Sequence, residues 1–355
     1  MRIIFLIDMD YFFAACEELR HPEIKGKPVI VGFDPKGGKG RGVVSTCNYE
    51  ARKFGIHSAM PISMAYKLKS DAIFLPIDYA YYESVSQKVM DLIKRYSTEF
   101  EQVSVDEIYI DVSDKVQDYS SAIKYANEIK ENIKSELGLP CSIGISSNKL
   151  MAKTACEAAK PNGVKVIRQE EAKEFLKNMP IGKLHGVGKK TEERLRAMGF
   201  DKIGDVAASN PSKLSNAFGL LGYEIYKNAN GIDDSEIFQD LEVRSIGRER
   251  TFDEDTTNKQ LIEDKIKGMA DEVFTEIMEK STYFKTVTIK IRYYDFVEHL
   301  KSKSMRHYSN DKQIIIDAAI NLFENFLEPG KKVRKIGIRV SNFNVQKGQK
   351  KLQDF

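Results

Sequence analysis

The first residues of the chain form an apolar run that ends in acidic side chains. Residues 3–7 are continuously apolar, which predicts a strand covered on both faces of its sheet. Asp10 precedes the helix-like segment 11–19, and its position predicts an N-cap. Asp8 lies where the buried strand would emerge, and capping does not explain it. Asp8 is therefore a candidate functional carboxylate.

A second apolar pattern surrounds two adjacent acidic residues, Asp106 and Glu107. The apolar positions on either side are Val103, Val105, Ile108, Ile110 and Val112. If the acidic pair forms a two-residue hairpin tip, Val105 faces Ile108 and Val103 faces Ile110 on one buried face. Adjacent carboxylates repel one another unless a cation lies between them. With Asp8 they could bind Mg²⁺ through oxygen ligands, whereas the stretch alone is explained equally well by an acidic surface turn.

The next segments predict an α+β arrangement. Residues 79–100 and 121–137 carry apolar stripes at helical spacing. Residues 141–146 alternate like a strand, and Asn148 is placed to cap a helix that runs to residue 159. This order is compatible with helices packed on an antiparallel sheet, but periodicity alone does not fix the topology.

Composition narrows the class of protein. The chain has 355 residues, 42% hydrophobic and 30% charged, which predicts a soluble protein of more than one domain. No apolar run is long enough to span a bilayer, and no signal-peptide pattern is evident. The four cysteines and five histidines lack zinc-site spacing, so reduced thiols in the cytoplasm are expected. A net charge of +3 does not by itself indicate nucleic-acid binding, so any such contact must come from local basic patches.

One segment suits a phosphate-bearing ligand. Thr46 or Asn48 can cap a helix on which Tyr49 and Arg52 share a face, and such a helix start favours a triphosphate. An ordinary surface helix is the alternative. The glycine-rich loop 34–42 lacks the P-loop pattern and is interpreted as a basic loop.

Residues 7–14 and 104–111, taken together, resemble the Y family of DNA polymerases in its DinB, or polymerase IV, branch, with archaeal members the most similar. The resemblance implies a right-hand polymerase with a palm, small fingers, a helical thumb and a little finger domain. It places the palm at residues 1–20 and 79–167 and the fingers at 21–78. The thumb follows at 168–230, a linker at 231–243, the little finger at 244–343 and a tail at 344–355.

The same resemblance assigns the catalytic residues. Asp8, Asp106 and Glu107, with the backbone carbonyl of Met9, would hold two Mg²⁺ ions, or Mn²⁺ in their place. Residues expected near the incoming nucleotide are Tyr11, Phe12, Phe13, Thr46, Tyr49, Arg52 and Lys160. Phe13 would be the steric gate against a ribose 2′-hydroxyl, with a core phenylalanine on an apolar helix face as the alternative. Lys160 is also explained as a cation at a helix end.

Residues 183–195 resemble a helix-hairpin-helix, which binds duplex backbone without reading bases. Gly186 and Gly188 would let the backbone approach a phosphate, and Lys189 and Lys190 would add charge. A plain helix–turn–helix connection is the alternative.

The remaining chain predicts a second α+β domain and a tail. Residues 230–243 are acidic, which departs from the basic linker of archaeal relatives. Helices at 258–279 and 311–327 and strands near 245–252, 285–294, 306 and 333–340 give a β-α-β-β-α-β order. Candidate DNA contacts there are Arg248, Arg334, Lys335 and Arg339, with a solvated sheet face as the alternative. The tail residues Gln349, Leu352 and Phe355 resemble a sliding-clamp peptide that lacks its second aromatic.

The expected function is template-directed DNA synthesis from dNTPs on primer-template DNA by a monomer. By resemblance it includes low-fidelity bypass of damaged bases, and no second acidic cluster suggests a proofreading exonuclease. A palm-type nucleotidyl cyclase would not need the helix-hairpin-helix. A non-catalytic DNA-binding scaffold would not need all three carboxylates. Both features occur together, so the polymerase interpretation is preferred.

Overall fold

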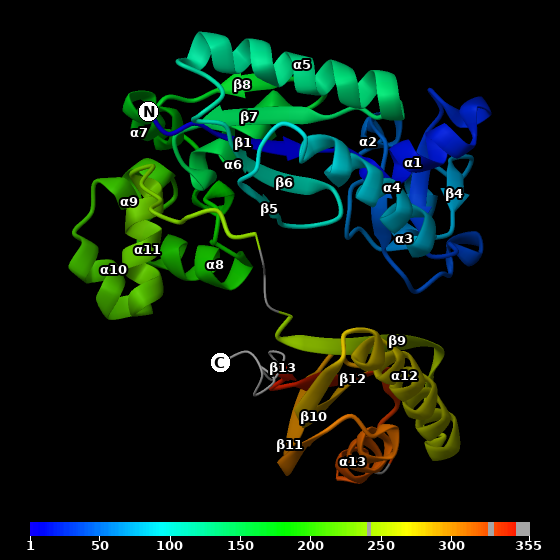
Figure 1. The fold of residues 1–355 in the computed structure, drawn as a ribbon. Coiled ribbons are helices and arrows are strands. Elements are labelled where there is room, and N and C mark those ends of the chain that lie inside the picture. Colours follow the sequence, from blue (N-terminus) through cyan, green and yellow to red (C-terminus); the bar gives the residue numbers. More distant parts are fainter. Residues whose placement is uncertain (240–242, 326–329, 346–355) are drawn as a thin grey trace, which may run out of the picture. The chain divides into compact units, whose positions relative to one another are not determined.

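The chain divides into two compact units at residue 240 of the sequence, and each is described by itself (Figure 1). The computed structural model describes residues 1–239, 243–325 and 330–345. In these ranges no helix combines the length and the apolar character that crossing a membrane requires.

The first unit is built on a five-stranded sheet in the order β5-β6-β1-β7-β8. These strands are Phe100–Gln102, Glu107–Asp111, Ile4–Asp8, Ser142–Ser146 and Val164–Val166, and β1 pairs antiparallel with both β6 and β7. Every residue of β1 is buried, as the apolar run predicts. Alternate residues pack into two separate clusters, Phe5 and Ile7 into one and Ile4 and Leu6 into the other.

Helices cover both faces of this sheet (Figure 1). The helices α4 (Tyr79–Ile93) and α5 (Tyr119–Leu137) contribute to the larger cluster, and α6 (Lys149–Ala159) packs on Leu6. Gly144 of β7 permits the close approach of α6, because a Cβ there would lie 2.0 Å from the carbonyl oxygen of Ala152. Asn148 caps α6 by accepting from the backbone N–H of Met151, which confirms the predicted cap.

A smaller three-stranded sheet, ordered β3-β2-β4, follows the first helix. The elements of this region are α1 (Phe12–Arg20), η1 (Pro22–Ile24), β2 (Val29–Gly32), η2 (Lys36–Gly38), β3 (Val44–Cys47), α2 (Tyr49–Arg52), α3 (Ile62–Leu68) and β4 (Ile73–Leu75). Asn48 rather than Thr46 caps α2, because its side chain accepts from the N–H of Ala51.

A helical region completes the first unit. Its elements are α7 (Gln169–Lys177), η3 (Ile181–Lys183), α8 (Lys189–Ala197), α9 (Ile203–Ala207), α10 (Pro211–Phe218) and α11 (Leu220–Ala229). The acidic segment after α11 returns to α6, where the Asp233 carboxylate accepts from the N–H of Leu150. A carboxylate is favoured at a helix N-terminus, so the first part of this acidic segment has a structural role.

The second unit has the predicted β-α-β-β-α-β order. Its sheet, ordered β11-β10-β12-β9, consists of Glu298–Ser309, Thr282–Tyr293, Val333–Ser341 and Ser245–Thr256. The short strand β13 (Asn344–Val345) also pairs with β10. The helices α12 (Lys259–Glu279) and α13 (Lys312–Glu324) pack their apolar side chains on one face of the sheet. The opposite face carries polar and charged side chains.

Two details of the sequence prediction are wrong. Helix α4 ends at Ile93 instead of continuing to residue 100. In the acidic hairpin, Gln102 pairs with Ile108, so Glu107 begins β6 and the turn spans residues 103–106. The hydroxyl of Ser104 accepts from the N–H groups of Asp106 and Glu107, which stabilises this wider turn and leaves Val103 43% exposed.

Candidate active site

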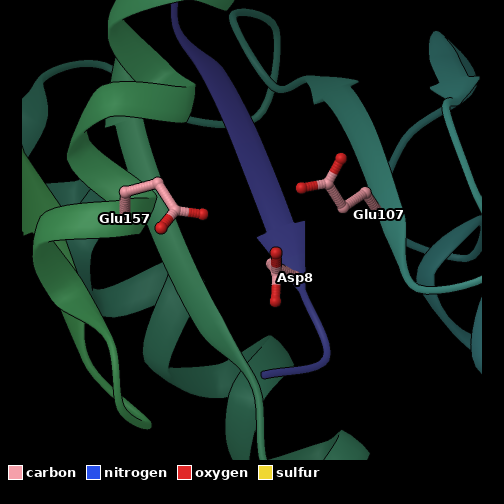
Figure 2. Close-up of side chains that lie close together, drawn as sticks. All are labelled: Asp8, Glu107 and Glu157. Carbon is pink, nitrogen blue, oxygen red and sulfur yellow. The ribbon is translucent and has the colours of Figure 1, made fainter. Parts of the chain in front are cut away.

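Two carboxylates meet at the edge of the larger sheet. Asp8 ends β1 and Glu107 begins β6, and the antiparallel register places them directly opposite one another. Asp8 is 3% exposed and Glu107 is half-buried. Figure 2 shows both side chains pointing into the same space as Glu157 of α6, with carboxylate oxygens of all three within 4.8 Å of one another.

Asp106 lies in the adjoining turn. Its carboxylate accepts from the hydroxyl of Ser104 at 2.5 Å, and its backbone carbonyl accepts from the N–H of Met9 at 3.0 Å. Asp8, Asp106 and Glu107 all line one pocket of about 430 Å³. The structure therefore brings the three predicted carboxylates into one site, and the Met9 backbone is bonded to the same turn.

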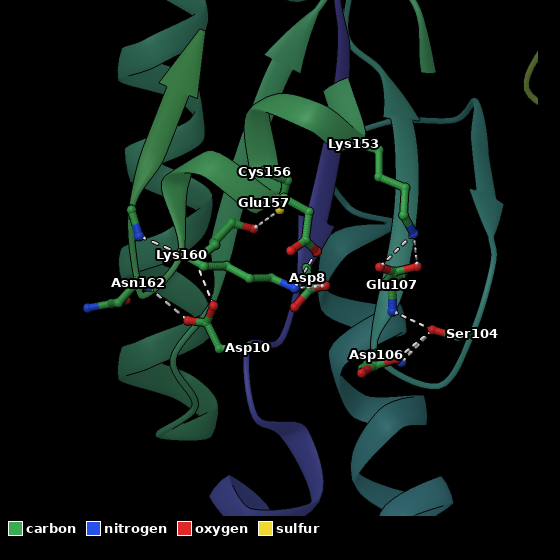
Figure 3. Close-up of polar contacts among 12 residues, drawn as sticks. Asp8, Asp10, Ser104, Asp106, Glu107, Lys153, Cys156, Glu157, Lys160 and Asn162 are labelled. Carbon is green, nitrogen blue, oxygen red and sulfur yellow. Dashed lines mark hydrogen bonds and ion pairs between the residues drawn. The ribbon is translucent and has the colours of Figure 1, made fainter. Parts of the chain in front are cut away.

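Two lysines neutralise these carboxylates (Figure 3). The Lys160 ammonium lies 2.7 Å from Asp8 Oδ2 and 2.8 Å from Glu157 Oε1. The Lys153 ammonium donates to both oxygens of Glu107, at 2.9 and 2.8 Å. Lys153 lies on α6 and Lys160 directly follows that helix, so one element supplies both cations.

Burial and pairing shift the pKa values in opposite directions. Burial raises the pKa of Asp8 to about 7, and the Lys160 ammonium offsets only part of that effect. Burial also disfavours ionised Glu107, but hydrogen bonds from Lys153 outweigh it and hold the pKa of Glu107 below its ordinary value. Lys160 is partly buried, which lowers its pKa, but the Asp8 carboxylate more than compensates and raises it.

The site fits a divalent cation. Asp8 Oδ1 is buried and has no hydrogen-bond partner among the residues that the structure describes. Carboxylate and carbonyl oxygens are the ligands that Mg²⁺ and Mn²⁺ take. An unpaired buried carboxylate oxygen beside two further carboxylates is costly unless a cation balances it. Glu157 was missed by the sequence analysis, although its spacing of three residues from Lys160 is a readable signal.

Asp10 does not cap the following helix, contrary to prediction. Tyr11 is the N-cap of α1, without a side-chain cap, and Asp10 has a positive φ of 46°. This left-handed conformation turns its carboxylate toward β7 and the segment after α6. There it accepts from Ser142 Oγ at 2.7 Å and from the backbone N–H of Asn162 at 2.9 Å. Asp10 thereby ties the Lys160-bearing segment to the end of β1.

Several predicted nucleotide contacts line the same pocket as the carboxylates. They are Phe12, Phe13, Thr46, Arg52 and Lys160, together with Ser45 and Ser58, which the sequence analysis did not single out. Phe13 stacks on Tyr82, with ring centroids 4.3 Å apart. The pocket thus has an acidic wall, a basic group on α2 and an aromatic wall.

Tyr11 and Tyr49, which were also predicted to contact the nucleotide, are not among the residues that line this pocket. The Arg52 guanidinium lies 4.7 Å from the centroid of the Tyr49 ring, as their spacing on α2 predicts. Tyr11 packs edge-on against the same ring and donates its hydroxyl to Glu18. The buried Tyr49 hydroxyl has no hydrogen-bond partner in the described parts of the chain.

The glycine-rich turn before α8 has the geometry expected of a helix-hairpin-helix. Gly186 has a φ of +89°, which L side chains rarely adopt, and Gly188 is the extended N-cap of α8. Lys189 and Lys190 follow in the first helical turn and are exposed. Backbone N–H groups at this helix start are available to an anion.

The four basic candidates of the second unit do not share one face. Lys335 and Arg339 lie on the open face, where Lys335 pairs with Glu249. Arg248 lies on the helix-covered face, paired with Glu272 and Glu276 of α12 at 3.2 and 2.9 Å. Arg334 lies 3.7 Å from Asp255 and over the ring of Phe296. The clamp-binding candidates Gln349, Leu352 and Phe355 lie outside the described residues.

Comparisons with known proteins identify the family of this chain. Three family models match: the impB/mucB/samB family at residues 7–157, its helix-hairpin-helix motif at 169–200 and its C-terminal domain at 243–353. The DNA polymerase IV of Methanoculleus marisnigri is 42% identical over 340 residues, 96% of this chain and 94% of that protein. DNA polymerase IV 2 of Methanosarcina mazei is 40% identical over 340 residues, 96% of this chain and 92% of that protein.

Solved structures give the same assignment. A Y-family polymerase chimera of Dbh and Dpo4 is 29% identical, with a TM-score of 0.86 over 97% of this chain and 99% of that chain. An insertion ternary complex of Dbh DNA polymerase is 28% identical, with a TM-score of 0.67 over 97% and 99% of the two chains. With the carboxylates gathered at the palm-like sheet edge, these likenesses show that the chain belongs to the Y family of DNA polymerases, in the DNA polymerase IV (DinB) branch.

Proposed function

We propose that this translesion DNA polymerase joins a primer 3′-hydroxyl to the α-phosphate of a dNTP in the pocket that Asp8, Asp106 and Glu107 line. The new bond is a phosphodiester, and pyrophosphate leaves with the broken α–β bond. The observation that carries the proposal is the convergence of three carboxylates, Arg52 and Lys160 on one pocket. The carboxylates suit metal ions, and the basic groups suit a triphosphate.

The metal ligands would be the side chains of Asp8, Asp106 and Glu107 and the carbonyl of Met9. Two Mg²⁺ ions, or Mn²⁺ in their place, supply Lewis acidity that favours ionisation of the primer hydroxyl and offsets charge on the transferring phosphate. Asp8 Oδ1 is free to bind such an ion now, whereas the oxygens of Glu107 are engaged by Lys153. A metal ion on Glu107 would lie close to the Lys153 ammonium, so repulsion between the two cations favours movement of Lys153 away from Glu107.

The chain's own cations would bind and orient the nucleotide. Arg52 projects from α2 into the pocket, where its planar guanidinium can hold phosphate oxygens in a bidentate manner. Lys160 lies between Asp8 and Glu157. When a metal ion binds Asp8 in its place, the Lys160 ammonium could pair with the triphosphate instead. The hydroxyl of Tyr49 is buried outside the pocket lining, so it would donate to the same phosphates only after the side chain moves.

Phe13 would act as the steric gate. Its ring forms part of the pocket wall and is fixed by stacking on Tyr82 and by an edge contact to Tyr79. A fixed ring beneath the sugar has no room for an additional 2′-oxygen, so the site would discriminate against ribonucleotides.

DNA would be held at two places outside the pocket. The turn at Gly186 and Gly188, followed by Lys189 and Lys190, offers backbone N–H groups and positive charge to duplex phosphates. On the second unit, Lys335 and Arg339 on the open face suit the same role, whereas Arg248 is occupied by α12. Arg334 is engaged by Asp255 and Phe296 and is a weaker candidate.

The domain boundaries predicted from the sequence complete the proposal. They comprise a palm at 1–20 and 79–167, fingers at 21–78, a thumb at 168–230, a linker at 231–243 and a little finger at 244–343. We further propose a monomeric cytoplasmic enzyme whose tail, through Gln349, Leu352 and Phe355, binds a sliding clamp.

Primer extension with Mg²⁺ and dNTPs tests the proposed chemistry. We expect wild-type protein to extend on undamaged and abasic-site templates and Asp106→Ala to lose more than about 100-fold in rate, because loss of even an indirect metal contact costs 10- to 100-fold. Asp114→Ala is the matched control, since Asp114 is exposed and its one ion pair within the described ranges is with Lys115 at the surface. If Asp106→Ala extends as well as Asp114→Ala, the assigned metal site is wrong. Duplex binding without extension by any of the three proteins would instead support a DNA-binding scaffold.

A further inference from the structure

Lys153 borders two different sites. On one side its ammonium is bonded to both oxygens of Glu107 (Figure 3). On the other side it lines a second pocket, of about 480 Å³, between α6 and the segment from α7 to the glycine-rich turn. Side chains in that pocket include Thr154, Glu157, Phe175, Lys183 and His185. Lys153 therefore belongs to both places: its ammonium pairs with a carboxylate of the metal site, and its side chain forms part of the wall of a neighbouring pocket.

The second pocket suits an anion. Its lining contains the cations of Lys153 and Lys183, and its one acidic residue, Glu157, is already paired with Lys160 at 2.8 Å. His185 also lines the pocket, but burial lowers the pKa of its imidazole, so its ring serves as a neutral polar group. His185 directly precedes Gly186, so the pocket adjoins the turn that we assign to duplex phosphates. A phosphodiester of the primer strand has the charge and the size for this position.

The two lysines at the metal site differ in whether they would still have a carboxylate partner after a metal ion displaced them. Lys160 bridges Asp8 and Glu157, so it retains a carboxylate partner after losing Asp8. Lys153 pairs with Glu107 alone among the residues that the structure describes. Displacement from Glu107 would leave its half-buried ammonium without a counter-charge, which is unfavourable. An anion in the second pocket removes that penalty.

We propose that Lys153 couples metal binding at Glu107 to binding of a primer-strand phosphate in the second pocket. Without DNA, Lys153 competes with the metal for Glu107. With DNA bound, Lys153 pairs with the phosphate and releases Glu107 to the metal. Because such coupling is reciprocal, metal binding strengthens the grip on the primer by the same factor. This inference rests on the proposed function and concerns when the metal site becomes available, not what it catalyses.

Mn²⁺ titration of the full chain, followed by the electron paramagnetic resonance of the free ion, tests this without catalysis. We compare protein alone with protein bound to a primer-template whose primer ends in a dideoxynucleotide. Wild type should bind Mn²⁺ more tightly when DNA is present. Lys153→Met should bind Mn²⁺ about two- to fivefold more tightly than wild type without DNA, as expected for loss of a partly exposed ion-pair competitor. DNA should then add little further affinity.

Two variants and one modified duplex make the test decisive. Lys183→Met removes a cation from the same pocket that does not contact Glu107, so it should weaken DNA binding and leave the DNA-free Mn²⁺ affinity unchanged. Lys153→Arg retains a cation, so DNA should increase its affinity for Mn²⁺, as it does for wild type. A methylphosphonate at the last primer linkages should abolish the DNA effect in wild type, and this arm remains informative if Lys153→Met does not fold.

The outcomes separate the two claims. An unchanged or weaker DNA-free Mn²⁺ affinity in Lys153→Met overturns the coupling, as does a DNA effect that survives both Lys153→Met and the methylphosphonate. Failure of the wild type to bind Mn²⁺ at all would instead overturn the metal site on which the proposed function depends.

Discussion

The β1 sheet of the first unit and the β12 sheet of the second unit both carry clusters of opposite charges, but they bury those charges to different extents. At the edge of the β1 sheet, the side chains of Asp8 and Lys160 are 5% and 19% exposed. On the open face of the β12 sheet, those of Glu249 and Lys290 are 40% and 26% exposed. The first cluster displays acidic groups held by lysines from α6. The second presents cations held by Glu249 and Glu298 across neighbouring strands.

The difference in burial between Asp8 and Glu249 gives their pKa shifts opposite signs, whereas Glu107, which Lys153 pairs at both oxygens, is lowered like Glu249. Burial raises the pKa of Asp8 to about 7, because the loss of water outweighs its lysine partner. Glu249 is less buried, so hydrogen bonds from Lys335 and Lys290 prevail over burial and its pKa is lowered. A desolvated carboxylate gains from a small, hard cation, whereas an exposed ion pair costs little to exchange for a DNA phosphate. The β1 sheet edge is therefore suited to binding a metal ion, and the open face of the β12 sheet is suited to binding DNA phosphates.

Among substitutions on the two sheets, the largest loss of kcat is expected at Asp10, whose buried carboxylate orders the segment next to Lys160. Asp10→Ala removes the acceptor for Ser142 and for the Asn162 N–H, and should lower kcat by about 10- to 100-fold, as for other indirect supports of a metal site. Asp10→Asn keeps an oxygen for the Asn162 N–H and should recover most of that loss. Steady-state primer extension measures both variants.

The matched change on the other sheet is Glu249→Ala, which removes an exposed carboxylate that also has two partners, Lys290 and Lys335. Its kcat should remain within about twofold of wild type, since exposed ion pairs contribute little. Equal kcat losses in the two alanine variants would refute the contrast, and so would an Asp10→Asn variant as slow as Asp10→Ala, because the role assigned to Asp10 depends on that acceptor.

A smaller effect, on selectivity, is expected at Phe13. Phe13→Ala opens the pocket wall beneath the sugar and should raise the ratio of rNTP to dNTP incorporation efficiency by about tenfold or more, within the 1–3 kcal/mol that shape discrimination supplies. Single-nucleotide kcat/KM values for a matched rNTP and dNTP give the ratio. Phe54→Ala, at a half-exposed ring that does not line the pocket, is the control and should leave the ratio unchanged. An unaltered ratio in Phe13→Ala would remove the steric-gate assignment.

Much of this architecture follows from local sequence. The apolar run before Asp8 predicts a strand buried on both faces, and the spacing of apolar residues predicts the β-α-β-β-α-β order of the second unit. Asn48 and Asn148 are recognisable caps because their amide oxygens can accept from a helix N–H two or three residues ahead. The alternation of residues in β9 could also have placed Arg248 correctly. Arg248 lies two residues after buried Ile246, so both side chains lie on the face that the helices cover.

Other features depend on contacts that sequence spacing does not reveal. Lys153 lies 46 residues from Glu107, and Lys160 lies 152 residues from Asp8, so both pairs arise only when α6 packs on the sheet. The hairpin register was missed because the Ser104 hydroxyl stabilises a wider turn than the alternation of valines suggests. Asp10 was misassigned because its left-handed backbone turns the carboxylate away from the helix that it precedes.

The smallest effect is a pH dependence confined to the second unit. Because the pKa of Glu249 is lowered in the folded state, its ion pairs stabilise that unit above the ordinary value of 4.5, and the contribution is lost as pH falls through the folded pKa. Glu249→Gln should therefore destabilise β9 and β12 at pH 6 by less than about 1 kcal/mol, given the exposure of these pairs. The difference from wild type should vanish at a pH well below 4.5. Hydrogen exchange of both proteins at each pH measures this, because intrinsic exchange rates cancel in the ratio. A difference that persists unchanged at the low pH would mean that Glu249 acts through packing, and the contrast between the two sheets would lose its electrostatic basis.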